Sequence, residues 1–127
     1  MATGPVKVVS AGDVPVRALG KGANIYRMIT KSREGSQNLL LGYVTFEPGS
    51  DWHDFAYTHL DEVYYVLKGR MELQWSEKPQ GYEWSDENRV EFKEGQAVFL
   101  PPGVRYRERC VGKEAAVFIC VITPPVE

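Results

Sequence analysis

Hydrophobic and polar residues alternate with a period of two along most of this chain. In the segment Arg70–Trp75, for example, Met71, Leu73 and Trp75 are separated by charged or polar residues. Successive side chains of a β-strand point to opposite faces, so this pattern predicts strands with one buried face. The predicted strands are Lys7–Val9, Ile25–Thr30, Asn38–Glu47, Glu62–Leu67, Met71–Trp75, Arg89–Phe92, Ala97–Leu100, Arg105–Cys110 and Ala115–Thr123.

Turn-forming residues divide these strands at short intervals. Glycine and proline stand in Pro48–Ser50, Lys68–Arg70 and Pro101–Gly103, and no amphipathic helix longer than two turns is visible. Many short strands with regular turns are typical of an all-β sandwich or barrel. The 127 residues, of which 43% are hydrophobic, suffice for a buried core, so we expect a single domain over residues 1–127.

The strand predicted near residues 104–110 has two different faces. Arginine occupies alternate positions on one face, namely Arg105, Arg107 and Arg109. The residues between them share the opposite face, namely Tyr106, Glu108 and Cys110. The arginine face either binds an anionic group or is a solvated or interface face balanced by nearby acids.

The last predicted strand, Ala115–Thr123, is apolar on both faces. A strand of this kind is usually covered on both sides. In a chain of 127 residues a second subunit can supply the outer cover, so the pattern predicts a homodimer.

The polar, turn-rich segment Ser76–Asn88 interrupts the alternation, although it carries Tyr82 and Trp84. We interpret it as a long hairpin loop whose aromatic residues fasten it to the barrel. The alternative interpretation is a lid over the mouth of the barrel.

Charge and cysteine content restrict the partners and the compartment. Fifteen lysines and arginines against 17 acids give a net charge of -2, so the chain as a whole is not attracted to nucleic acid or an anionic membrane. No apolar run reaches the roughly 20 residues of a membrane helix, and no signal peptide is visible. Cys110 and Cys120 are too few for a disulfide framework, so we expect a cytoplasmic protein without nucleic-acid or membrane partners.

Two segments carry the motifs of a known family. Gly49–Gly69 has Glu62 separated by six residues from its final glycine, and Gly95–Tyr106 has Pro101 and Gly103 at the spacing Gly-x5-Pro-x-Gly. These segments resemble the two motifs of the cupin superfamily, and the first is most similar to ethanolamine-utilisation cupins. The resemblance implies a double-stranded β-helix, the RmlC-like cupin jelly-roll barrel, with its chemistry inside.

The metal-ligand part of the motif is degenerate in this chain. Metal-binding cupins hold the metal with three histidines and one glutamate, and only Glu62 is in register. The positions expected for histidine hold other residues, namely Phe55 or Ala56, Tyr57 or Thr58, and Tyr106. The two histidines of the chain, His53 and His59, lie out of register.

The resemblance places the chemistry where the two motifs face each other, and Tyr57, His59, Glu62 and Tyr106 can converge there. An unpaired carboxyl in an apolar barrel has a raised pKa, which suits Glu62 to general acid or base catalysis. His59 is a candidate base or metal ligand because histidine titrates near neutrality. Tyr57 and Tyr106 are candidate acids or oxyanion donors, and His53 lies in a polar loop. The alternatives are barrel scaffolding for Glu62 and the tyrosines, and solvent exposure for the histidines.

These residues support three hypotheses of function. The first is an acid–base enzyme of the lyase, isomerase, epimerase or cyclase type, which acts on a small organic molecule. The sequence implies no definite cofactor for it. The second is a metal-dependent dioxygenase or lyase in which His53, His59 and Glu62, with Tyr106, hold iron, manganese, nickel or zinc. The third is a non-catalytic ligand-binding or accessory module.

Overall fold

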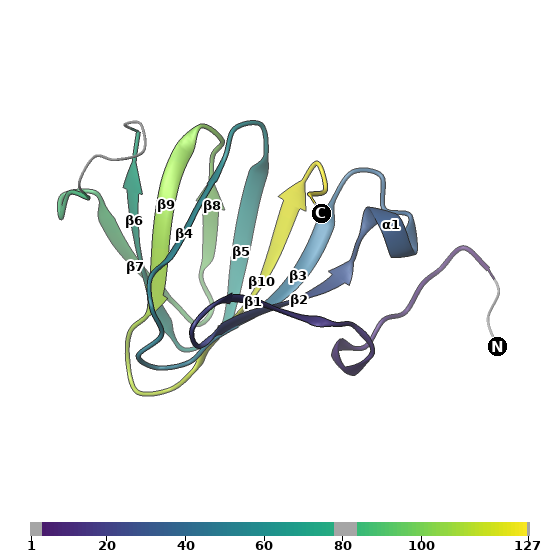
Figure 1. Ribbon diagram of the computed structural model, residues 1–127, viewed down its shortest axis with the longest axis horizontal. Coiled ribbons are helices and arrows are strands. Elements are labelled where there is room, and N and C mark those ends of the chain that lie inside the picture. Colours follow the sequence, from purple (N-terminus) through teal and green to yellow (C-terminus); the bar gives the residue numbers. More distant parts are fainter. Residues whose placement is uncertain (1–3, 78–83, 127) are drawn as a thin grey trace.

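The computed structural model describes residues 4–77 and 84–126, and within them the chain forms ten β-strands in two antiparallel sheets (Figure 1). The larger sheet contains, in spatial order, β1 (Val16–Gly20), β2 (Ala23–Ile29), β3 (Leu40–Phe46), β10 (Ala116–Thr123), β5 (Asp61–Lys68) and β8 (Ala97–Leu100). The smaller sheet contains β4 (His53–Tyr57), β9 (Val104–Cys110), β6 (Arg70–Ser76) and β7 (Arg89–Lys93). A 3-10 turn, η1 (Ala11–Asp13), and a short helix, α1 (Lys31–Glu34), complete these elements.

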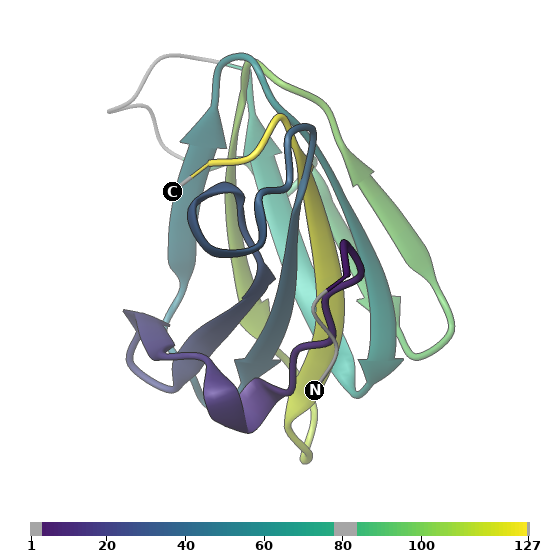
Figure 2. The same cartoon turned by 90° about the vertical axis from the view of Figure 1, so that its right-hand side faces the viewer.

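The two sheets form the layers of a jelly roll, which confirms the predicted all-β fold (Figures 1 and 2). The core lies between them because every second residue of the central strands points inward. Phe46 of β3 and Phe118 of β10 are fully buried, and their rings stack with centroids 5.9 Å apart. Met71, Leu73 and Phe92 supply the core from the smaller sheet.

Three details of the predicted strands are wrong. Residues Lys7–Val9 form no strand, and lie outside both sheets. The strands β1 and β4 were missed, since their inward positions are not a run of aliphatic residues. The inward row of β4 is His53, Phe55 and Tyr57, so His53 lies on a strand and not in a polar loop. Alternation of residue classes identifies a strand only when the buried face is apolar.

The hairpin expected around residues 76–88 joins two paired strands. Leu73 of β6 faces Val90 of β7 in an antiparallel register. Its residues 78–83, with Tyr82, lie outside the described residues, so the interpretation of this segment as a lid stays a prediction. Trp84 is described, and contacts the outer face of the smaller sheet.

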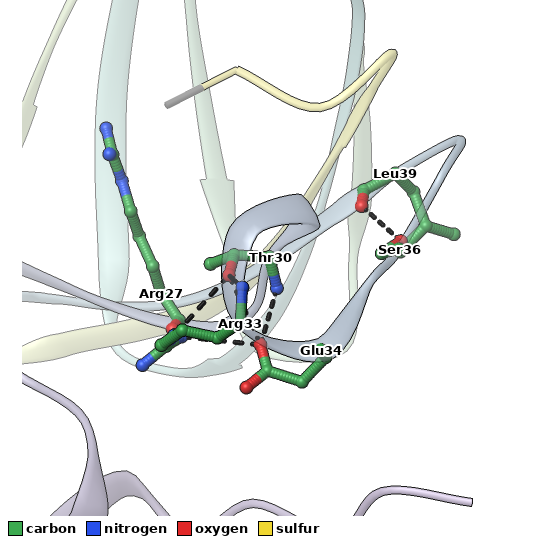
Figure 3. A network of polar contacts seen from close by, with 6 residues as sticks. All are labelled: Arg27, Thr30, Arg33, Glu34, Ser36 and Leu39. Atoms are coloured by element: carbon green, nitrogen blue, oxygen red, sulfur yellow. Dashed lines mark hydrogen bonds and ion pairs between the residues drawn. The ribbon is translucent and has the colours of Figure 1, made fainter. Parts of the chain in front are cut away.

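The helix α1 is capped at both ends, and Figure 3 shows the polar contacts around its first residues, directly after β2. The Thr30 hydroxyl accepts a hydrogen bond from the Arg33 amide at 3.1 Å, and Glu34 Oε1 accepts one from the Thr30 amide at 2.8 Å. This reciprocal arrangement resembles a capping box. The Arg33 guanidinium also donates to the carbonyl of Arg27, whose own side chain runs away from this network (Figure 3). Among the described residues no helix is long and apolar enough to cross a membrane.

Candidate functional site

A cavity lies between the sheets at one end of the barrel and contains a cluster of titratable side chains. Its volume is about 50 Å³, counted as space open to the centres of water molecules. A single water needs roughly 10–15 Å³ on this measure, so the cavity holds a few atoms. Its lining is Leu19, Ile25, Arg27, Leu40, Val44, His53, Phe55, Tyr57, Glu62, Tyr64, Glu108, Phe118, Cys120, Ile122 and Val126.

Glu108 is the most deeply buried carboxyl of this cluster, with 2% of its surface exposed. It accepts a hydrogen bond from the Tyr64 hydroxyl at 2.9 Å, and its Oε2 lies 3.3 Å from Nδ1 of His53. The register of β4 on β9 places His53 directly opposite Glu108, so both side chains project from one face. Burial raises the pKa of Glu108, while His53 and then Tyr64 oppose the rise.

Glu62 lies on β5 and is the second carboxyl of the cavity. Only 5% of its surface is exposed, and none of the described residues hydrogen-bonds to its Oε1. Burial is the main reason that the pKa of Glu62 rises from 4.5 to about 8, and the charge of Glu108 adds to it. Glu62 therefore carries its proton at neutral pH, and its carboxyl can donate a hydrogen bond to a ligand.

Tyr57 projects inward from β4 and lines the same cavity. Burial, and secondarily the charge of Glu62, raises the pKa of Tyr57 to about 12. Its hydroxyl is therefore neutral at neutral pH and can act as a hydrogen-bond donor. The structure thus brings together three of the residues singled out from the sequence, namely His53, Tyr57 and Glu62.

Two other candidates do not line the cavity. His59 is exposed in the bend between β4 and β5. The hydroxyl of Tyr106 donates to the carbonyl of Pro101 at 2.7 Å, and its ring packs against Phe55 with centroids 5.3 Å apart. Burial and then Glu62 raise the pKa of Tyr106 to about 12. Neither residue is placed to touch a molecule bound between Glu62 and Glu108.

Glu108 and Tyr64 were not singled out from the sequence, although alternation gave a signal for both. Glu108 lies on the buried face that it shares with Tyr106 and Cys110, where a carboxyl side chain is rare. Tyr64 shares the inward face of β5 with Glu62. A search for charged residues on predicted buried faces would have found Glu108.

The residues present do not fit the metal that the cupin resemblance implies. The inward positions of β4 that correspond to the two histidines of the first motif hold Phe55 and Tyr57, and Tyr106 takes the place of the third. Among the described residues, no three or more histidine, cysteine, aspartate or glutamate side chains lie close enough to hold a metal ion. Aromatic rings therefore fill the space in which the ligands would converge.

A ladder of alternating tryptophan and arginine side chains supports the site from outside. The Arg107 guanidinium carbon lies 4.2 Å from the ring centroid of Trp52 and 5.0 Å from that of Trp84. Arg109 lies 4.2 Å from the Trp52 ring, and Arg105 lies 4.7 Å from the Trp84 ring. Trp52 directly precedes His53, and its two arginines flank Glu108 in β9. The ladder therefore holds these strands together where the His53–Glu108 pair forms.

Solved structures with the same fold support this architecture. KdgF from Halomonas sp. aligns with a TM-score of 0.70 and 13% identity over 94% of this chain and 96% of that chain. A predicted oxalate decarboxylase from Thermotoga maritima aligns with a TM-score of 0.69 and 18% identity over 92% and 98% of the two chains. The polyketide cyclase RemF from Streptomyces resistomycificus aligns with a TM-score of 0.69 and 21% identity over 96% and 84%.

These sequence identities are too low to imply a shared activity, so the similarity shows a common fold alone. No curated protein matches this sequence. The family model described as a cupin domain matches residues 42–122, which include both motif segments from Glu62 to Tyr106. This chain belongs to the cupin domain family.

Proposed function

We propose that this chain is a single-domain cupin that binds a small organic molecule in the barrel and acts on it by acid–base chemistry. The observation that carries the proposal is the protonated carboxyl of Glu62, whose Oε1 has no hydrogen-bond partner among the described residues, in a cavity that it shares with the His53–Glu108 pair. A buried titratable group with a strongly raised pKa, placed in a cavity, is typical of a general acid.

The three groups have complementary roles in this proposal. Glu62 donates a proton or a hydrogen bond to an oxygen of the substrate on which negative charge develops. With Nδ1–H of His53 directed at Glu108, the other ring nitrogen keeps its lone pair and acts as the base. Tyr57 supplies a second neutral donor to the same oxygen. In an isomerisation, His53 takes a proton from one carbon of the substrate while Glu62 gives its proton to the neighbouring oxygen. His53 then returns its proton at another position of the substrate and Glu62 recovers its own from the oxygen, which leaves the isomer and restores both groups.

This division of roles suits reactions that move a proton without a net change of oxidation state. Lyases, isomerases, epimerases and cyclases are of this kind. The substrate has an oxygen that accepts a hydrogen bond from Glu62 and a small apolar part that contacts residues such as Val44 and Phe118. A molecule of a few heavy atoms, or the end of a longer one, fits the cavity.

The test is a thermal-shift screen of small hydroxy acids, oxo acids and sugars, followed by proton NMR of each stabilising mixture. We expect at least one compound to be converted by the wild type and not by Glu62→Gln or His53→Asn. Glu94→Gln and His59→Asn are matched controls, because both residues are exposed, and should keep wild-type turnover. Full turnover by Glu62→Gln would overturn the assignment. Stabilisation without conversion would instead indicate a non-catalytic binding module.

We also propose that the protein works as a homodimer in the cytoplasm. The outward side chains of β10 are apolar, which supports a second subunit over the larger sheet. The two cysteines are buried and free, which is ordinary in a reducing compartment. Light scattering after gel filtration measures the oligomeric state directly.

A further inference from the structure

Arg27 of β2 is a charged residue in a row of inward-facing apolar side chains. The other inward positions of this row are Ala23 and Ile25, and both are buried. Arg27 itself is half-buried and lines the cavity that contains Glu62 and Glu108. Removing a charge from water is costly, so an arginine that points into a cavity is usually matched by an anion.

The main chain of Arg27 is held in place from two sides. Its carbonyl accepts a hydrogen bond from the guanidinium of Arg33, while its own side chain extends away from this network (Figure 3). β2 pairs with β3 in regular register up to Arg27, which lies opposite Gly42, and the register shifts before Ile29. A shift of this kind bends the strand and changes the direction of its side chains. The backbone at Arg27 is therefore fixed, and its side chain is left to the cavity.

Arg27 and Glu62 approach the cavity from opposite sides. β3 and β10 separate β2 from β5, so roughly 14 Å, or three strand spacings, lie between the backbones of the two residues. At the level of Arg27, the inward residues of the two strands between them are short, namely Gly42 and Cys120. Tyr57 feels the charge of both sides: burial and then Glu62 raise the pKa of its hydroxyl to about 12, while Arg27 lowers it.

The charges around the cavity favour an anion at the Arg27 end. The guanidinium stays positively charged at every pH near neutrality, while Glu62 holds its proton. The charge of Glu108 is met by His53 and by the hydroxyl of Tyr64. A guanidinium presents its N–H donors in a planar fork that matches the two oxygens of a carboxylate.

We propose that the molecule bound in this cavity is a small carboxylic acid, whose carboxylate pairs with Arg27 and whose second oxygen, a hydroxyl or a carbonyl, accepts a hydrogen bond from Glu62. This inference rests on the proposed function, because it names the substrate class of the same site. Leu40 and Ile122 line the cavity between the two groups and contact the carbon chain. The ion pair at Arg27 orients the molecule, so that its other end reaches Glu62 and His53. Short-chain oxo and hydroxy acids meet these requirements.

The first test measures binding apart from turnover. The probes are 2-oxobutanoate, 4-oxopentanoate and 5-oxohexanoate, which differ in the distance between carboxylate and carbonyl oxygen, and each is compared with its neutral amide by titration calorimetry. We expect at least one acid to bind at least about tenfold more tightly than its amide, because the amide forms no charge-assisted pair with Arg27. Equal affinities for acid and amide, or no binding of any of the three acids at millimolar concentration, would overturn the proposal.

Variants of Arg27 test whether this residue holds the carboxylate. Arg27→Gln should weaken the binding of the acid at least about tenfold and leave that of the amide unchanged. Arg27→Lys keeps the charge and loses the planar fork, so its affinity should lie between the two. Arg17→Gln is the matched control, because it removes the same charge from an exposed position on the neighbouring β1 and should bind as the wild type does. Circular dichroism checks the fold of each variant, and wild-type affinity for the acid in folded Arg27→Gln would contradict the proposal.

Turnover measurements separate this inference from the catalytic proposal. If an acid binds through Arg27 and the protein converts no compound, the carboxylate site stands and the acid–base chemistry fails. If the wild type and Arg27→Gln convert a neutral compound equally well, the acid–base chemistry stands and the carboxylate site fails.

Discussion

Replacing Glu62 with glutamine should stabilise the protein at pH 8 and above and change its stability little near pH 4.5. The pKa of Glu62 rises from 4.5 to about 8 on folding, chiefly because the carboxyl is buried. A carboxyl with a raised pKa holds its proton more tightly in the folded state than in the unfolded one. Its stabilising effect is therefore complete below pH 4.5 and is lost as pH rises towards 8.

The size of this loss follows from the shift in pKa. Each pKa unit corresponds to about 1.4 kcal/mol, so the rise from 4.5 to about 8 is worth about 5 kcal/mol once Glu62 is ionised. Glutamine has nearly the same shape and stays neutral at every pH, so the variant does not suffer this loss. The difference in unfolding free energy should grow by about 1.4 kcal/mol per pH unit between these two values.

Urea denaturation followed by tryptophan fluorescence measures both proteins from about pH 5 to about pH 9. The exposed Glu94→Gln variant is the control, and its difference from the wild type should stay flat with pH. A flat difference for Glu62→Gln as well would refute the reasoning, because Glu62 would then be ionised with a normal pKa inside the barrel.

Three further predictions concern the surroundings of the cavity. Tyr64→Phe removes a donor from the buried Glu108 and should lower the unfolding free energy by about 1–3 kcal/mol, measured by urea denaturation; an unchanged value would show that the hydrogen bond is not formed. Trp52→Ala removes one rung of the ladder beside Arg107 and should lower the unfolding free energy by about 1–2 kcal/mol, measured by urea denaturation. An unchanged unfolding free energy would show that the ladder does not hold these strands together. Added zinc or manganese should leave the melting temperature unchanged within about 1 °C, and saturable stabilisation by either metal would contradict our reading of the site.

The barrel could be predicted from the sequence because its determinants are local. Glycine and proline mark the corners, and apolar positions repeat with a period of two inside Leu40–Phe46 and Arg70–Ser76. At Gly69 the backbone has a positive φ of 80°, and an added Cβ would lie 2.6 Å from the carbonyl oxygen of Ala115. Only glycine fits such a corner. A motif made of turn residues can be recognised in the sequence even when the pairing of the strands is unknown.

The cavity could be predicted only in part, because its contacts join residues that are far apart in the chain. Glu62 was found through its register in the motif. The pair of His53 with Glu108 spans 55 residues and depends on the register of β4 against β9, which no local pattern specifies. His59 and Tyr106 were chosen for residue type and register, but the type of a side chain does not fix where its polar atoms point. The hydroxyl of Tyr106 bonds to Pro101 in the neighbouring corner.

The loss of the histidine ligands and the raised pKa of Glu62 have one physical cause. In a metal-binding cupin the glutamate faces a cation, which favours its ionised form. Here the neighbouring inward positions hold Phe55 and Tyr57, whose rings displace water and bring no positive charge. Desolvation then dominates the pKa of Glu62, the charge of Glu108 raises it further, and a hydrogen-bond contribution from Cys120 opposes both only in part. The glutamate that is an anionic metal ligand in a metal-binding cupin therefore keeps its proton in this chain, where it can act as an acid.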